Sequence, residues 1–106
     1  MYVATGEFDL LLGNVASLKV KRSVVKPLVG GLRHHFDVAS GEVGDPDLLR
    51  RVVIGAAAVS NDATDARAVI EACERWLAAR PEAELLAARL RVFRPGDDFP
   101  PLADLR

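Results

Sequence analysis

The sequence predicts a small α+β domain in which four strands form one antiparallel sheet and two helices cover one face. The chain has 106 residues, enough for one hydrophobic core and too few for two. Segments with the two-residue period of strands alternate with segments that have the period of a helix, in the order β-α-β-β-α-β. Two such halves in a chain of this length are typical of a ferredoxin-like sandwich, in which the strands lie in the order 4-1-3-2.

The first strand and the first helix are predicted from their hydrophobic periodicity. From Tyr2 to Leu12 apolar residues alternate with Glu7 and Asp9, which is typical of a strand with one buried face. From Lys19 to Phe36 the apolar residues fall on one face of a helix. Pro27 is unfavourable inside a helix, as are the two glycines that follow it. We therefore expect this helix to begin late or to bend at Pro27.

The second half of the chain supplies two further strands and a helix. Val38–Val43 is a weak strand, and the next residues, GDPD, have turn chemistry, with one helical turn possible after them. Arg51–Ser60 is apolar on both faces, as expected of a central strand. Asp62 is placed to cap a second helix, which ends before Pro81.

Glu84–Phe93 alternates again and is predicted to be the last strand. We therefore place the ferredoxin-like domain at residues 1–93 and a proline-rich, irregular tail at residues 94–106. In this fold the last strand lies antiparallel beside the first. Glu7 and Asp9 are then expected to face Arg89 and Arg91 on the open side of the sheet, where opposite charges stabilise a strand pair.

The composition of the chain limits the classes of protein to which it can belong. The net charge is −1, so a nucleic-acid partner would need a local basic patch. Cys73 is the single cysteine, so no disulfide partner exists within the chain, and we expect a reducing cytoplasm. No apolar run is long enough to span a membrane, and the apolar N-terminal segment reads as a strand and not as a signal peptide.

The charges reverse sign within the first half of the chain. Ser17–Phe36 contains five bases and no acid, and Asp37–Leu49 contains four acids and no base. The bases, which are the candidate anion-binding residues, are Lys19, Lys21, Arg22, Lys26 and Arg33. One interpretation is that the two segments neutralise each other at the surface, at about 0–1 kcal/mol a pair. The alternative is that the flank formed by Arg22, Lys26 and Arg33 stays free and binds the phosphates of RNA, free or in the ribosome.

The open face of the predicted sheet carries a strip of apolar side chains. Its members are Val3, Val53, Ala57 and Val59. Recognition of RNA bases on this face would need aromatic rings on the two central strands, and none is expected there. Either the chain's own tail covers the strip through Phe99 and Leu102, or a second copy or another partner packs on it. The sequence leaves these possibilities open.

No catalytic arrangement is apparent in the sequence. His34 and His35 are adjacent, so they point apart on a helix and do not form a metal-binding pair. Cys73 lies on the apolar face of the second helix, where a thiol usually packs without reacting. No nucleophile is accompanied by a histidine and an acid at suitable positions. We therefore expect no enzymatic activity, no metal and no cofactor.

Three motifs resemble the YlxP-like family of small bacterial proteins of unknown function. They are SLKVKRS at Ser17–Ser23, EVGDPDL at Glu42–Leu48 and AVSND at Ala58–Asp62, and the similarity spans about residues 1–93. The resemblance implies a ferredoxin-like fold and a bacterial cytoplasmic protein with no established reaction. Genes of this family often neighbour genes for translation and ribosome maturation, which points toward RNA. The chain departs from the pattern at Gly41, where a larger residue would suit a strand, and in its proline-rich tail.

Overall fold

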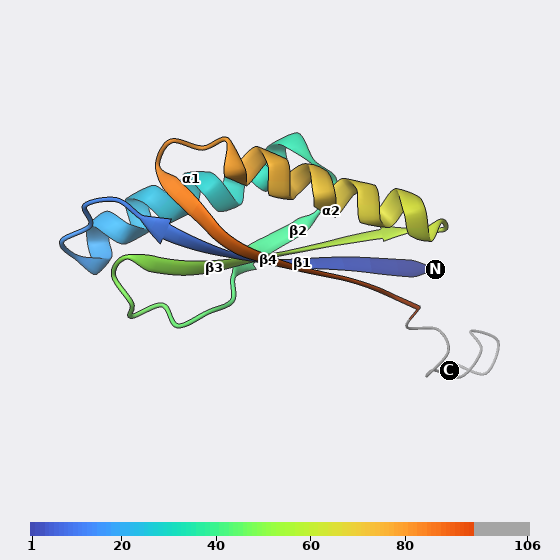
Figure 1. Cartoon of the computed structure of the whole chain (residues 1–106), viewed down its shortest axis with the longest axis horizontal. Helices are drawn as coiled ribbons and strands as arrows, with labels where there is room; N and C mark the ends of the chain where they lie inside the picture. The colour runs from blue at the N-terminus through green and yellow to red at the C-terminus, as the bar shows by residue number, and fades with distance from the viewer. Residues whose placement is uncertain (95–106) are drawn as a thin grey trace, which may run out of the picture.

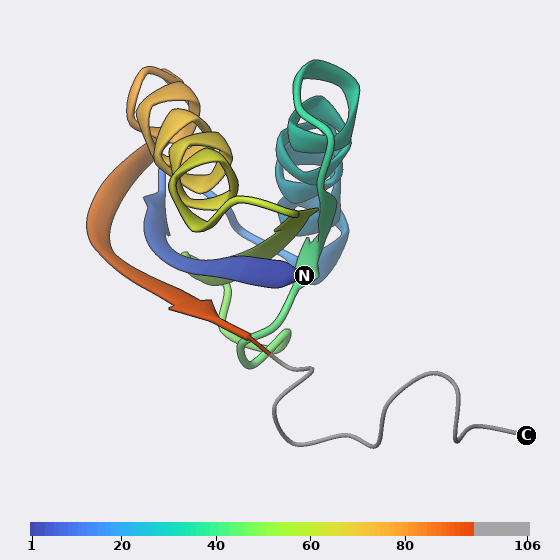
Figure 2. The same cartoon turned by 90° about the vertical axis from the view of Figure 1, so that its right-hand side faces the viewer.

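Both helices lie on the same face of a four-stranded sheet, and the opposite face is open (Figures 1 and 2). The computed structural model describes residues 1–94. The elements are β1 (Tyr2–Leu12), α1 (Leu18–His35), β2 (Ala39–Glu42), β3 (Arg51–Ser60), α2 (Ala63–Ala78) and β4 (Ala83–Phe93). Neighbouring strands are antiparallel, in the order β2-β3-β1-β4. The predicted ferredoxin-like fold and strand order are confirmed. The predicted tail lies outside the described residues, apart from Arg94.

The core fills the space between the sheet and the helices. Alternate residues of β1 and β3 point toward the helices and are buried, which explains the two-residue period of these strands. The helices contribute one apolar face each. The largest apolar side chains of the core are Phe8, Leu10, Leu12, Leu28, Leu32, Val52, Ile54, Ile70 and Leu77.

The first helix begins at Leu18 and continues without interruption to His35, so the expectation of a late start is wrong. Ser17 caps it, because its hydroxyl accepts a hydrogen bond from the backbone N–H of Val20 at 3.2 Å. Pro27 is exposed. The backbone carbonyl that a proline deprives of its partner is therefore on the solvent side, where water can satisfy it.

Gly31 permits close packing of the two helices. A Cβ atom at this position would overlap the indole ring of Trp76. The same ring is covered on other sides by the guanidinium group of Arg80, 4.5 Å from its centroid, and by the imidazole of His35 at 5.4 Å. The glycine that is unfavourable for the helix in isolation is thus required by its tertiary contact.

The remaining elements follow the prediction closely. β3 has the predicted bounds, and Asp62 caps α2 by accepting hydrogen bonds from the N–H groups of Thr64 and Asp65, at 2.8 and 3.1 Å. β2 is shorter than predicted, and no helical turn forms at residues 48–50. Residues 43–50 instead form a loop that lies on the open side of the sheet (Figures 1 and 2). No helix among residues 1–94 is long and apolar enough to cross a membrane.

Of the two acids expected to face Arg89 and Arg91, Glu7 is the one that pairs with β4 within residues 1–94. Glu7 lies opposite Arg89, and their side chains pair at 3.0 Å. Because partner numbers fall along β4 as they rise along β1, Asp9 then lies opposite Ala87, and Arg91 lies opposite Thr5. The expectation that these acids face the two arginines is therefore confirmed for Glu7 and wrong for Asp9. Asp9 pairs across the other side of β1, with Arg51 of β3.

Candidate functional site

Three of the five predicted anion-binding residues converge on one groove between α1 and β2. The groove has a volume of about 370 Å³. Its lining residues are Arg22, Val25, Lys26, Val29, Arg33, Gly41 and Glu42. Spacings of four and seven residues place the three bases along one side of the helix. At a rise of 1.5 Å per residue they span about 16 Å of its length. We call this feature the basic groove.

Lys21 is placed apart from the other bases. Its side chain is 2% exposed, and its ammonium group lies 3.1 Å from Oε1 of Glu42. The same group donates a hydrogen bond to the backbone carbonyl of Pro46 at 3.1 Å. Lys21 therefore joins α1 to β2 and to the turn that follows β2. The basic and the acidic segment thus pair with each other at Lys21, as the first of the two interpretations expected. Lys21 is therefore not accessible to a ligand.

The other four bases of the segment are not neutralised by carboxylates within residues 1–94. Lys19, Arg22, Lys26 and Arg33 are exposed, and none of them forms an ion pair in this part of the chain. Arg33 donates one hydrogen bond from Nε to the hydroxyl of Ser40, at 3.3 Å. Glu42, the acid in the groove, is already engaged by Lys21. The basic groove therefore presents a net positive surface.

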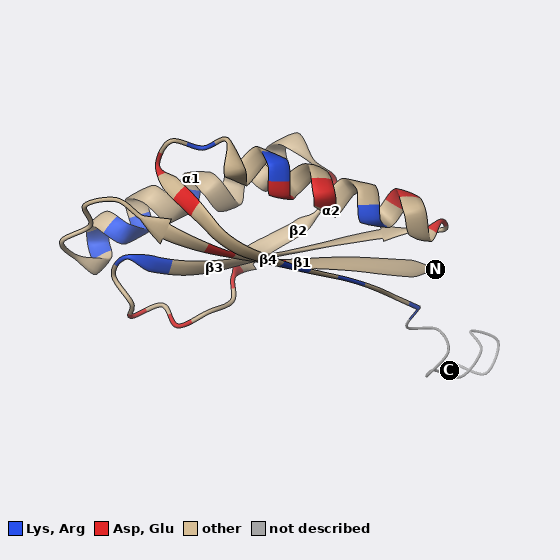
Figure 3. Cartoon of the chain, viewed as in Figure 1, with Lys and Arg blue, Asp and Glu red and all other residues tan. Residues whose placement is uncertain are grey.

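The charges at the start of α1 are unfavourable for the N-terminal end of a helix. The first turns of α1 hold bases and no acid, although the N-terminal end of a helix is itself positive. α2 shows the ordinary arrangement, with Asp62 at its cap and Asp65 in its first turn. In Figure 3 the α1 ribbon carries blue segments and no red ones, whereas α2 carries both. The helix dipole therefore adds to the positive potential at this end of α1.

The edge of β2 provides backbone donors beside the basic groove. The N–H of Val43 donates to the carbonyl of Val53 at 2.9 Å, so residues 39, 41 and 43 direct their hydrogen-bonding groups toward β3. The N–H and C=O groups of Ser40 and Glu42 point in the opposite direction, toward the free edge of the sheet. The hydroxyl of Ser40 donates to the carbonyl of Val29 and holds the strand close to α1. An anion in the groove would thus meet cationic side chains and backbone N–H groups together.

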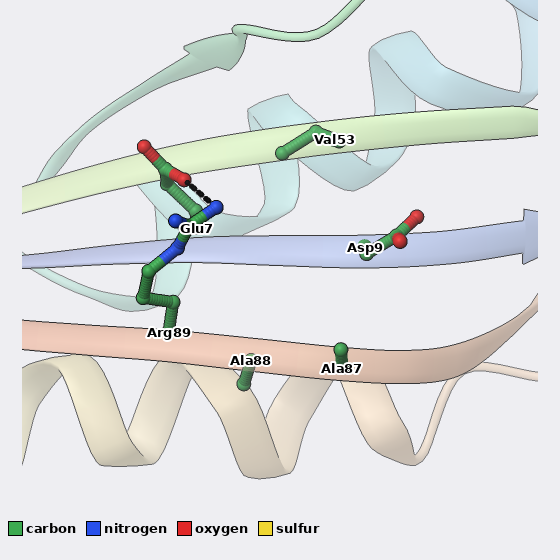
Figure 4. A pocket seen from close by; sticks show the side chains of 6 residues that line it. All are labelled: Glu7, Asp9, Val53, Ala87, Ala88 and Arg89. Atoms are coloured by element: carbon green, nitrogen blue, oxygen red, sulfur yellow. Dashed lines mark ion pairs between the residues drawn. The ribbon is translucent and has the colours of Figure 1, made fainter.

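The open face of the sheet has a different character. A hollow of about 350 Å³ is lined by Glu7, Asp9, Val53, Ala87, Ala88 and Arg89, and Figure 4 shows the Glu7–Arg89 pair extending over it. The strand registers place Val3, Val53, Ala57 and Val59, the predicted interface residues, on this face. The open-face positions of β1 and β3 hold no aromatic ring, so these strands offer no stacking platform for bases. Phe93 of the edge strand β4 also lies on this face, opposite Val3, a placement that follows only from the register.

No metal-binding cluster is found within residues 1–94. No group of three or more His, Cys, Asp or Glu side chains there is arranged to hold a metal ion. Cys73 is fully buried, and desolvation raises the pKa of its thiol to about 11, so the thiol stays protonated at neutral pH. His35 packs against Trp76, with 5.4 Å between the ring centroids.

The fold and the groove define a ferredoxin-like α+β protein with a basic groove between its first helix and its edge strand. Residues 3–90 match the family described as "Protein of unknown function (DUF503)", and the chain belongs to this family. It is also similar to "Uncharacterized protein YlxP" of Bacillus subtilis (strain 168). The two are 26% identical over 91 residues, which are 86% of this chain and 99% of the relative. The predicted resemblance is confirmed, and neither description names a reaction or a partner.

Proposed function

We propose that the protein binds RNA, free or in the ribosome, by holding the sugar–phosphate backbone in the basic groove. One observation carries this proposal: Arg22, Lys26 and Arg33 are exposed, lack carboxylate partners within residues 1–94 and line a single groove. RNA is favoured over other polyanions because genes of the family that the chain resembles often neighbour genes for translation. Binding does not depend on bases stacking on β1 and β3, whose open face has no aromatic ring.

Contacts to phosphates give binding that tolerates changes of sequence and weakens steeply with salt. Because the overall charge is −1, attraction of RNA has to come from a local basic surface such as this groove. The bases at the start of α1 oppose the helix dipole at a cost of a few tenths of a kcal/mol each. Such a loss of stability is expected where residues are needed for binding a ligand and not for the fold.

Replacing Arg22, Lys26 and Arg33 together by Ala is expected to weaken binding of a single-stranded RNA at least tenfold at low salt. Each phosphate contact on a single strand contributes about −0.7 to the slope of log K against log salt. Loss of three contacts should therefore flatten that slope by about 2. The measurement is a fluorescence anisotropy titration of labelled RNA at four or more salt concentrations, repeated with DNA of the same sequence.

The control variant carries three Ala substitutions at other exposed arginines, Arg67, Arg75 and Arg91. It loses the same formal charge but keeps the basic groove, so its salt slope should stay close to that of the wild type. If RNA binding were weakened equally in the two variants, the effect would come from the loss of net charge and not from the groove. Unchanged binding in the groove variant would refute the proposal.

We also propose that the protein acts by binding and not by catalysis, and that it works in the cytoplasm. Two features support this view: the thiol of Cys73 is buried and protonated, and neither histidine belongs to a group of three or more His, Cys, Asp or Glu side chains that could hold a metal ion within residues 1–94. A single cysteine agrees with a reducing compartment.

A further inference from the structure

The basic groove has an apolar floor beside its row of cations, which are Arg22, Lys26 and Arg33. Val25 and Val29 form this floor on α1, and they are 5% and 7% exposed. Helical periodicity places them between the row of cations and the buried face of the helix. A phosphate gains nothing from an apolar surface, because removing its charge from water costs free energy. The phosphates of a ligand therefore stay at the cations, and the floor takes a less polar part of the ligand.

The cations of the groove form one row and not two. All three belong to α1, and the opposite wall consists of Gly41 and of Glu42, whose charge is engaged by Lys21. A single row about 16 Å long meets the phosphates of one strand. Domains that recognise double-stranded RNA by its shape contact two successive minor grooves over about 16 base pairs. The row of cations is too short for that mode of binding.

The free edge of β2 carries hydrogen-bonding groups that match an unpaired nucleobase. The backbone N–H and C=O of Ser40 and of Glu42 point away from β3, and none of them has a backbone partner within residues 1–94. Each of these residues therefore offers a donor beside an acceptor. The Watson–Crick edge of every nucleobase also presents a donor beside an acceptor. In a duplex those groups are already paired, so only an unpaired nucleotide can use the edge of β2.

We propose that the basic groove holds an unpaired nucleotide and therefore selects single-stranded over double-stranded RNA, an inference that rests on the proposed function. The phosphates bind the row of cations, the nucleobase covers the floor, and its Watson–Crick edge hydrogen-bonds to the backbone of β2. The groove volume of about 370 Å³ lies in the range of about 300–1,000 Å³ that is typical of sites for small organic ligands. Because every nucleobase offers a donor and an acceptor, binding stays tolerant of sequence.

The two walls of the groove are held together before a ligand binds. The hydroxyl of Ser40 donates to the carbonyl of Val29 at 2.9 Å, and Nε of Arg33 donates to the same hydroxyl at 3.3 Å. The ion pair of Lys21 with Glu42, at 3.1 Å, ties β2 to α1 a second time. The floor and the strand edge thus keep their relative positions, which lowers the cost of ordering the site on binding.

Three oligonucleotides of equal length test the inference on the wild-type, full-length protein: a single-stranded RNA, the same RNA as a duplex, and an abasic strand. Fluorescence anisotropy at low salt should give a dissociation constant at least fivefold lower for the single strand than for either of the others. A site for phosphates alone would favour the duplex, which has twice as many phosphates, and would bind the abasic strand as well as the RNA.

Equal or tighter binding of the duplex or of the abasic strand would overturn the inference and leave RNA binding by the basic groove in place. If none of the three oligonucleotides bound, the proposed function would be refuted and the inference with it. The two failures are therefore distinguishable.

Ser40→Pro and Ser40→Ala test the contact with the strand edge. Both variants lose the hydroxyl, but only proline removes the N–H, which lies outside the ladder with β3, and edge strands tolerate proline at such positions. Ser40→Pro should bind the single-stranded RNA about threefold to tenfold more weakly than Ser40→Ala, as expected for the loss of a hydrogen bond. The abasic strand should bind both variants equally, and circular dichroism will verify the fold. Equal affinity of the two variants for the RNA would contradict the placement of the nucleobase.

Discussion

Replacing Glu42 by Gln is expected to lower the free energy of unfolding by roughly 2–4 kcal/mol, because it leaves a buried ammonium group without its counter-charge. The side chain of Lys21 is 2% exposed, and its ammonium group has one further partner, the carbonyl of Pro46. The side chain of Glu42 is 25% exposed, which keeps the expected loss below that of a fully buried pair. The measurement is equilibrium unfolding in urea at neutral pH.

Replacing Lys21 by Met removes the charge that needs compensation and keeps the long aliphatic side chain. We expect this variant to lie within about 1.5 kcal/mol of the wild type, since apolar replacement of a buried ion pair is often close to neutral. The double variant Lys21→Met/Glu42→Gln should be more stable than Glu42→Gln alone. If Glu42→Gln is as stable as the wild type, the ion pair does not hold β2 against α1.

Gly6→Ala is expected to cost roughly 2–3 kcal/mol of stability, because the core has no space for a methyl group at this position. A Cβ atom there would lie 2.5 Å from Cζ of Phe8 and 2.7 Å from Cγ2 of Ile70. Both side chains are completely buried, so neither can move aside without displacing others. The loss is net of the small gain expected when a strand glycine becomes alanine. Thermal and urea unfolding measure it.

Gly41→Ala is the matched control on the edge strand β2. Nothing lies within 4 Å of a Cβ atom at this position, and its backbone is not in the left-handed region. Alanine should therefore stabilise the protein by up to about 1 kcal/mol. Equal effects of the two substitutions would contradict the account of packing around Gly6.

The fold was predictable because its elements carry strong local signals. The two-residue period of residues 2–12, the doubly apolar segment at residues 51–60 and the Asp62 cap each specify an element without help from tertiary contacts. The register of β4 is a long-range property. Its consequences, the pairing of Asp9 with Arg51 and the place of Phe93 beside Val3, did not follow from the sequence.

The burial of Lys21 could have been predicted. Lys21 precedes Val25 by four residues and Leu28 by seven, which places it on the apolar face of the helix. A lysine on such a face needs a carboxylate, and the acidic segment that follows supplies Glu42. The contact of Gly31 with Trp76 had no comparable signal, because it depends on how the two helices are packed. One side of the basic groove was predictable, because helical spacing places Arg22, Lys26 and Arg33 along one flank of α1. The other side depends on where β2 lies, which the sequence did not predict.

The most direct test of RNA binding by the basic groove is NMR mapping, for which a protein of 11.4 kDa is well suited. Amide resonances of the ¹⁵N-labelled protein would be followed while a short single-stranded RNA is added at low salt. We predict saturable shifts at residues 18–33 and at Ser40–Glu42, which reverse when salt is raised. Shifts confined to the open-face residues of β1, β3 and β4, or no saturable shifts, would contradict the assignment of the basic groove as the RNA-binding site.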